Sequence, residues 1–132
     1  MADPLFRLAC AAGILEDSPE GWVSTMLQEG QLALLVDDGG LDAITAVAHA
    51  LDLVTVPLLR NEETPAQQES TVMSYAESKP LIWIAGGFGE AATRWAHQRG
   101  AMTLLVETDG PLSPDERRRV ERFVVILGRQ AE

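Results

Sequence analysis

The sequence predicts one α/β domain in which short buried strands alternate with amphipathic helices. The chain has 132 residues, 46% of them hydrophobic, which is enough for a single core. Four short apolar runs are bounded by turn residues, as buried strands are. Four copies of one helix-start pattern lie between and around them. The predicted strands are 32–36, 53–59, 81–85 and 102–106.

The helix-start pattern is a side chain with an oxygen followed directly by proline. The oxygen can accept hydrogen bonds from free backbone N–H groups, and proline at the first helical position loses no hydrogen bond. Gln67 and Glu116 lie three residues after two of these caps and complete capping boxes. The four pairs are Asp3-Pro4, Ser18-Pro19, Thr64-Pro65 and Ser113-Pro114.

These starts predict helices over 4–12, 19–29, 65–77 and 114–127, with Gly13, Gly30 and Gly128 as C-terminal caps. A fifth helix is predicted over 88–99, where apolar residues recur at helical spacing until Gly100. These apolar residues are Phe88, Ala91, Ala92, Trp95 and Ala96.

The segment 41–51 is ambiguous between helix and strand. Its apolar residues recur at helical spacing and four alanines favour a helix, whereas the β-branched Ile44, Thr45 and Val47 favour a strand. Periodicity predicts a helix. A helix there makes strands and helices alternate from residue 32 onward, which predicts an open parallel sheet of Rossmann or flavodoxin type.

Composition limits the classes of function. Twenty acidic and ten basic residues give a net charge of −10, which disfavours nucleic-acid binding. Cys10 is the only cysteine, so we expect no disulfide and a small buried side chain. No apolar run is long enough to span a membrane, and we expect a cytoplasmic protein without cofactors.

Two glycine-rich turns are candidate sites. Asp37-Asp38-Gly39-Gly40 fits a tight turn, a metal site or a nucleotide loop, and the turn is favoured because the residues match no nucleotide motif. Gly86-Gly87-Phe88-Gly89 fits a strand-to-helix turn or an anion site on the next helix. In a Rossmann-like domain that binds a small molecule or nucleotide, Asp37, Asp38, Gly86, Gly87 and Gly89 would line the crevice. His49 and His97 have no further ligand at metal-binding spacing.

The chain has an aspartate–glycine motif at 38–42 and a glycine-rich turn followed by a helix and a strand at 86–105. These two segments resemble the Mrr-type restriction-endonuclease domain. "DGGLD" at 38–42 is similar to its Asp-Gly-Gly-aliphatic-Asp motif. The segment 86–105 is similar to its last helix and strand, with Phe88, Ala92, Ala96 and Gly100 at the corresponding places. The resemblance covers roughly 30–106. It implies a restriction-endonuclease-like sheet flanked by helices, with Asp42 as a metal ligand. This is the fold we expect, and the Rossmann or flavodoxin type is the alternative.

The same resemblance implies a glutamate or glutamine, one spacer and a lysine on the next strand. The carboxylates would hold Mg²⁺ against the scissile phosphate and the lysine would stabilise the developing charge. The segment 52–60, "DLVTVPLLR", has neither, and Lys79, the only lysine, lies beyond the next helix. We therefore expect a catalytically inactive domain with no bound metal, in which Asp42 is vestigial. Protein–protein interaction or regulation, beside a DNA-processing or defence system, is the function this implies.

The predicted helix 114–127 is the candidate interaction surface. It has one apolar face, and Val125 and Ile126 fall outside that face, so we expect some of its surface to contact a protein partner or a second copy. Arg117, Arg118 and Arg122 belong to the chain's only basic cluster and would face acidic groups of that partner. An additional buried strand over "RFVVIL" is the alternative. The interaction residues are Val120, Phe123, Val124, Ile126 and Leu127, with these three arginines.

Overall fold

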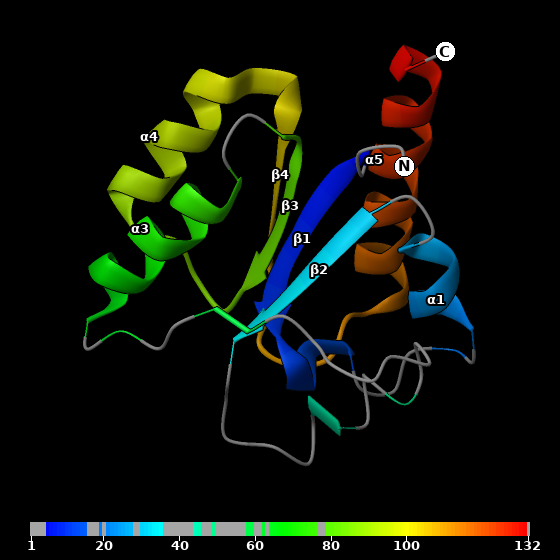
Figure 1. Cartoon of the computed structure of the whole chain (residues 1–132), viewed down its shortest axis with the longest axis horizontal. Helices are drawn as coiled ribbons and strands as arrows, with labels where there is room; N and C mark the ends of the chain where they lie inside the picture. Colours follow the sequence, from blue (N-terminus) through cyan, green and yellow to red (C-terminus); the bar gives the residue numbers. More distant parts are fainter. Residues whose placement is uncertain are drawn as a thin grey trace.

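The computed structural model describes residues 5–15, 19, 21–27, 30–35, 44–45, 49, 58–59, 62, 64–76 and 79–131. In these residues the chain forms an α/β fold in which helices cover both faces of a parallel sheet (Figure 1). The α/β class predicted from the sequence is therefore confirmed.

The described sheet has four strands, all parallel, in the order β2-β1-β3-β4. Register joins Phe6 to Gly30 across β1 and β2, and Leu81 to Thr103 across β3 and β4. The first strand in the sequence thus lies at the centre of the sheet. The strands are β1 (Phe6–Ala11), β2 (Gly30–Leu35), β3 (Leu81–Ala85) and β4 (Thr103–Glu107).

The helix predicted over 4–12 is wrong, because Phe6–Ala11 is the central strand β1. Its side chains alternate between the two faces: Phe6, Leu8 and Cys10 join one apolar cluster, and Ala9 joins the other. Burial on both faces of a parallel sheet outweighs the helical propensity of its alanine and leucine residues. Gly13 accordingly caps no α-helix; it lies in the short 3₁₀ helix η1 (Ala12–Leu15) that follows β1.

The other helices predicted from local caps are present. Thr64 Oγ1 accepts a hydrogen bond from the backbone N–H of Gln67 at 3.2 Å, as the predicted cap requires. The helix expected over 19–29 is shorter, since Gly21 has a φ of 80° and the helix begins after it. α5 continues past Gly128, so the predicted end there is wrong. The α-helices are α1 (Trp22–Met26), α3 (Pro65–Ala76), α4 (Glu90–Arg99) and α5 (Pro114–Ala131), and a 3₁₀ turn, η2 (Gly100–Met102), follows α4.

The segments 41–51 and 53–59 can be compared with the structure only in part. Within 41–51, Ile44, Thr45 and His49 have helical conformation, as periodicity predicted, and the remaining residues lie outside the described ones. Within the predicted strand 53–59, Leu58 forms a parallel bridge with Leu34, and Leu59 N–H donates to Leu34 O at 2.9 Å. Residues 53–57 lie outside the described part.

Two apolar clusters hold the helices against the sheet. The cluster on the α1 and α5 side includes Val23, Val120 and Leu127, and the cluster on the α3 and α4 side includes Val72 and Ala92. Figure 1 shows the corresponding helix layers on either side of the strands. α1 follows β1 on one face of the sheet, and α4 follows β3 on the other. The connections after these two neighbouring parallel strands therefore run to opposite faces.

Two arginines fix the amino-terminal end of the sheet. Arg7 on β1 donates to the carbonyl of Tyr75 and lies 5.2 Å from the centre of its ring. Arg99 at the end of α4 donates to the carbonyl of Lys79 and lies 4.5 Å from the centre of the Trp95 ring. Both guanidinium groups therefore satisfy carbonyls at or after the end of α3, where a positive charge is favourable. Burial lowers the pKa of Arg99.

Candidate functional site

The carboxyl ends of β1 and β3 are where a doubly wound sheet places a ligand. The turn after β3 contains Gly86, Gly87 and Gly89, so three of the predicted ligand-binding residues lie at this edge. Asp37, Asp38 and Asp42 lie outside the described residues. The backbone hydrogen bond from Leu112 to Ile14 O joins the turn before α5 to the turn after β1.

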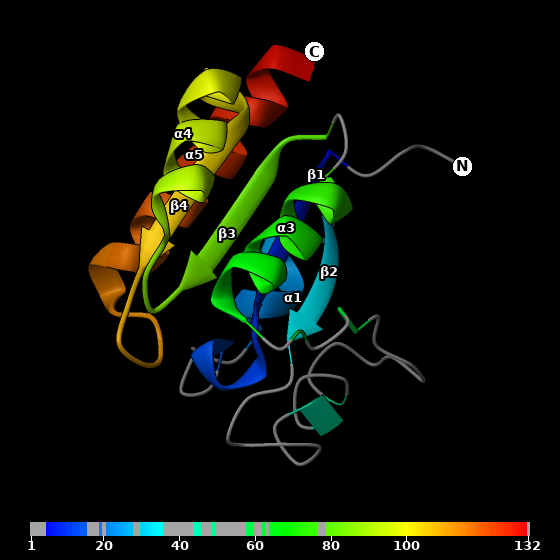
Figure 2. The same ribbon diagram turned by 90° about the vertical axis from the view of Figure 1, so that its left-hand side faces the viewer.

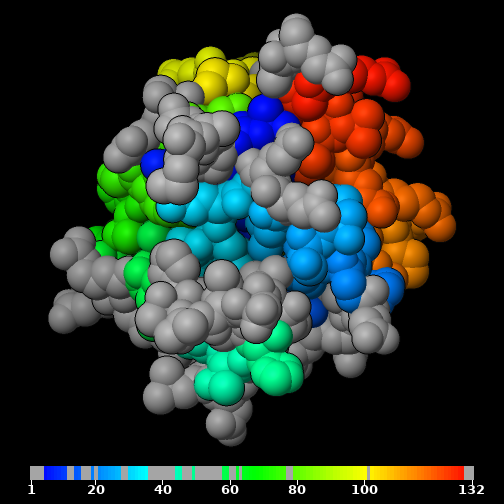
Figure 3. Space-filling view, turned by 45° about the vertical axis from the view of Figure 1, so that its right-hand side comes forward, coloured from blue at the N-terminus to red at the C-terminus, as the bar shows by residue number. Residues whose placement is uncertain are grey.

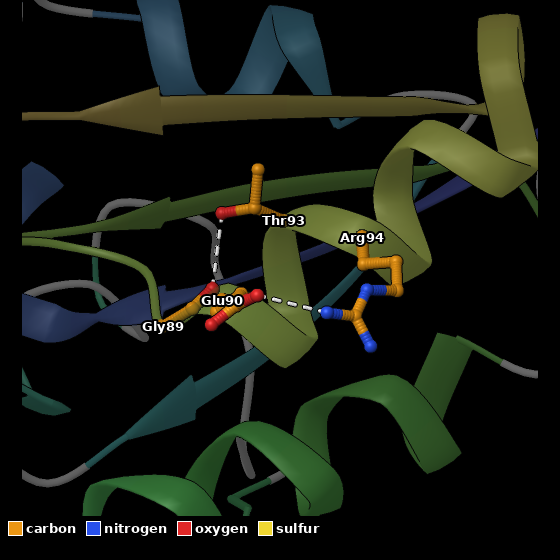
Figure 4. A network of polar contacts seen from close by, with 4 residues as sticks. All are labelled: Gly89, Glu90, Thr93 and Arg94. Carbon is orange, nitrogen blue, oxygen red and sulfur yellow. Dashed lines mark hydrogen bonds and ion pairs between the residues drawn. The ribbon is translucent and has the colours of Figure 1, made fainter.

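The N-terminus of α4 already holds an anionic group from the chain itself. Glu69 on α3 accepts a hydrogen bond from the Gly89 N–H at 2.6 Å. In the first turn of the helix, Thr93 Oγ1 donates to Gly89 O at 3.0 Å and Arg94 pairs with Glu90 at 2.8 Å (Figure 4). A carboxylate on the first free N–H occupies the position that an external phosphate would use.

Other oxygen atoms approach the same glycine-rich turn. A Cβ added at Gly87 would lie 3.7 Å from a carboxylate oxygen of Glu107, and one added at Gly86 would lie 3.7 Å from the carbonyl oxygen of Thr108. None of these neighbours attracts an anion. The described part of this edge is therefore poorly suited to a phosphate group.

A shallow hollow of about 560 Å³ lies along α4. All of its lining residues except Phe88 are exposed, and its arginine is paired with its glutamate along the helix. It is thus an open surface feature rather than an enclosed site. The lining residues are Phe88, Glu90, Thr93, Arg94, His97 and Gln98.

No metal centre is found among the described residues. Within them, no three histidine, cysteine, aspartate or glutamate side chains are placed to hold one ion. His49 and His97 are both exposed. The vestigial metal site predicted at Asp42 lies outside this comparison.

The residues predicted for interaction on α5 divide into two groups. Val120 is fully buried and Leu127 is 5% exposed, while Phe123 and Val124 pack against the same cluster. Val120 and Leu127 therefore stabilise the domain and cannot offer a contact surface, which corrects the prediction for them. Ile126 is 45% exposed, and Val125, which was not among the predicted contact residues, is 53% exposed. The alternative of a buried strand over 122–127 is wrong, because these residues are helical.

The arginines of α5 also differ in their surroundings. Arg117 donates to Leu112 O at 2.8 Å, so it holds the turn before the helix. Arg118 pairs with Asp115 at 3.0 Å on the surface. Arg119 donates to Leu105 O on β4 at 3.3 Å, a contact that the sequence alone did not indicate. Arg122 is exposed.

The start of α5 is the predicted capping box. The Glu116 N–H donates to Ser113 Oγ at 3.2 Å, and the Ser113 N–H donates to Glu116 Oε1 at 2.8 Å. The hydrogen bond from the Ser113 backbone lowers the pKa of Glu116. This reciprocal cap fixes where the helix begins and hence which side chains face outward.

Five of the exposed residues of α5 are called the α5 strip below: Arg118, Arg122, Val125, Ile126 and Arg129. In Figure 3, α5 forms one margin of the molecular surface.

None of the helices in the described part of the chain combines the length and apolar character needed to cross a bilayer. Comparison with protein-family models, curated proteins and solved structures found nothing that matches the chain.

Proposed function

We propose that this chain is a non-catalytic α/β domain that acts through protein–protein contact at the α5 strip. The observation that carries the proposal is the exposure of Val125 and Ile126, consecutive residues of a long helix, whereas Val120, Phe123, Val124 and Leu127 of the same helix pack against the core. Neighbouring exposed apolar groups rimmed by polar ones are typical of a contact surface.

Charge supports the same surface. Residues 114–131 contain five of the ten basic residues and three of the twenty acidic ones, so α5 carries +2 and the remaining 114 residues carry −12. Such a helix attracts acidic protein surfaces, including the rest of a second copy. Salt bridges at an exposed rim contribute little affinity, so the arginines would mainly orient the contact.

For the fold, we favour the doubly wound, Rossmann or flavodoxin type over the restriction-endonuclease type. The all-parallel sheet supports it, as does the helical conformation of Ile44, Thr45 and His49. If the bridge at Leu58 is counted as a strand and the strands are renumbered in chain order, their order across the sheet becomes 3-2-1-4-5, as in a Rossmann sheet. The relationship to Mrr-type nucleases, and with it the link to DNA processing or defence, remains a prediction from the resemblance.

Small-molecule binding at the carboxyl edge is the weaker alternative. The topology supports a crevice between β1 and β3, but Glu69 already occupies the N–H of Gly89. A phosphate ligand would have to displace a carboxylate held at 2.6 Å. This contact favours the interaction function over nucleotide binding.

Sedimentation equilibrium over a wide concentration range tests the interaction function with the chain itself. We expect wild type to self-associate reversibly and Ile126→Asp to remain monomeric, because a charge would be buried in the contact. Ala91→Asp is the matched control: it places the same charge at an exposed apolar residue of α4 and should behave as wild type. Wild type that stays monomeric at high micromolar concentration would contradict self-association.

A further inference from the structure

β4 is an unpaired edge of the sheet in the part of the chain that the structure describes. At the opposite side, β2 is bridged by Leu58, whereas β4 has β3 as its single described neighbour. Figure 2 shows β4 at the margin of the sheet, with α4 and α5 beside it. An open edge of this kind is a template for another strand.

The direction of the backbone groups on β4 follows from two hydrogen bonds. Thr108 N–H donates to Ala85 O at 3.0 Å, so the backbone N–H and C=O groups of the even-numbered residues of β4 point toward β3. Leu105 O accepts from Arg119, which places the odd-numbered residues on the outer side. The N–H groups of Leu105 and Glu107 therefore point away from the sheet, beside the outward carbonyl groups.

Arg119 covers part of this edge. Its guanidinium group lies 3.3 Å from Leu105 O, a long and exposed hydrogen bond. Positively charged side chains commonly protect edge strands in this way. A flexible arginine at the surface is displaced easily, because such a contact contributes little to stability.

Exposed apolar side chains gather near the same edge. Ile126 follows Arg119 by seven residues, so it lies on the same side of α5 as the residue that reaches β4. Met102, directly before β4, is 37% exposed. α5 runs back along β4 (Figure 2), so the later turns of the helix, which include Ile126, lie toward the beginning of the strand.

The exposed apolar side chains of the α5 strip cover only part of a standard interface. Standard interfaces bury about 800 Å² on each partner, far more than two half-exposed side chains provide. Adding the backbone of β4 and Met102 extends the surface along the whole edge. The occupant must therefore supply a strand as well as an apolar contact.

We propose that β4 pairs antiparallel with β4 of a second copy, so that the described strands of the two copies join into one continuous sheet. This inference rests on the proposed interaction function. A strand edge is complementary to itself in this arrangement, because a two-fold axis sets each outward N–H against an outward carbonyl of the other copy.

Charge along α5 fits the same arrangement. Antiparallel strands bring the two α5 helices antiparallel on one face of the joined sheet. When the axis passes near Leu105 and Arg119, Glu116 of one copy lies opposite Arg122 of the other, since both are three residues from Arg119. The acidic first turn of each helix thus meets the basic middle of its partner.

Amide hydrogen exchange, followed by NMR at low and high protein concentration, tests the pairing residue by residue. We expect exchange at Leu105 and Glu107 to slow at least about tenfold as the dimer forms. Leu104 and Val106 are the internal controls, since their N–H groups face β3 in both states and should show no such change. Ile126→Asp should remove the concentration dependence.

Arg119→Ala separates edge pairing from contact through α5 alone. If β4 pairs, the variant should dimerise several-fold more tightly, because the competitor for Leu105 O and a like charge at the axis are both removed. If α5 alone makes the contact, loss of a positive charge should weaken the dimer or leave it unchanged. A dimer that is sensitive to Ile126→Asp but shows no protection at Leu105 would overturn edge pairing and leave the proposed function standing. A monomer under all conditions would overturn both.

Discussion

Tyr75 is the only tyrosine in the chain, and its hydroxyl donates to Gln31 O at 3.3 Å. Burial raises the pKa of Tyr75 from 10.0 to about 12, although the charge of Arg7 acts in the opposite direction. The folded state therefore holds this proton more tightly than the unfolded state does. The resulting stability is present in full below pH 10 and is lost as the pH rises toward about 12.

Because Tyr75 is the only tyrosine, its titration can be measured without a signal from another phenol. We expect phenolate absorbance to titrate near pH 12 in the folded protein and near pH 10 in concentrated urea. Arg7→Ala should raise the folded midpoint further, because it removes the charge that stabilises the phenolate. A folded midpoint at pH 10 would show that the phenol is not shielded from solvent.

At the scale of elements, α3 and α4 are joined by one carboxylate. Glu69 caps α4 from a different helix, and a Cβ added at Gly89 would lie 2.7 Å from its Oε1. The φ of Gly89 is −72°, so alanine is compatible with the backbone and would disturb only the carboxylate. Glycine is needed here for the close approach of Glu69.

A double-mutant cycle on this cap gives the second prediction. Glu69→Ala should destabilise the domain by about 1 kcal/mol, as loss of a helix cap does. Gly89→Ala should remove most of the same interaction, so the double variant should cost less than the sum of the single ones. Urea unfolding measures all four proteins. Strictly additive free energies would mean that the hydrogen bond contributes nothing in solution.

Elements defined by local chemistry could be predicted from the sequence, and those defined by distant contacts could not. Thr64 and Ser113 marked two helices correctly because a cap needs only the next three residues. β1 was predicted as a helix because its burial on both faces depends on β2 and β3, which lie far along the chain.

The candidate site also has a part that could be predicted from local sequence and a part that could not. The exposed position of Ile126 follows from helical periodicity, which the sequence shows directly. The contacts of Glu69 with Gly89 and of Arg119 with Leu105 cross between elements and leave no local pattern. Because the sequence predicts a helix where β1 lies, it also does not show that β4 is at an edge of the sheet.

At the scale of the whole molecule, the net charge of −10 opposes contact with nucleic acid. We expect no measurable binding to duplex DNA at physiological salt, because the acidic residues of the chain outnumber its basic residues, including those of α5, and repel the phosphate backbone. Fluorescence anisotropy with labelled duplex would measure this, and low salt provides the more permissive control. Salt-dependent binding at low micromolar concentration that is lost in Arg122→Ala would contradict the prediction.

The central position of β1 also has a consequence for synthesis on the ribosome. β1 has both of its neighbours only when Leu81–Ala85 has emerged, about 70 residues later. Until then one side of Phe6–Ala11 has no strand beside it, and the nascent chain must hold an apolar segment without its β3 partner. Folding that depends on contacts so distant in sequence is slow. The protein is therefore most exposed to misassembly and to chaperone binding during translation, before β3 pairs with β1.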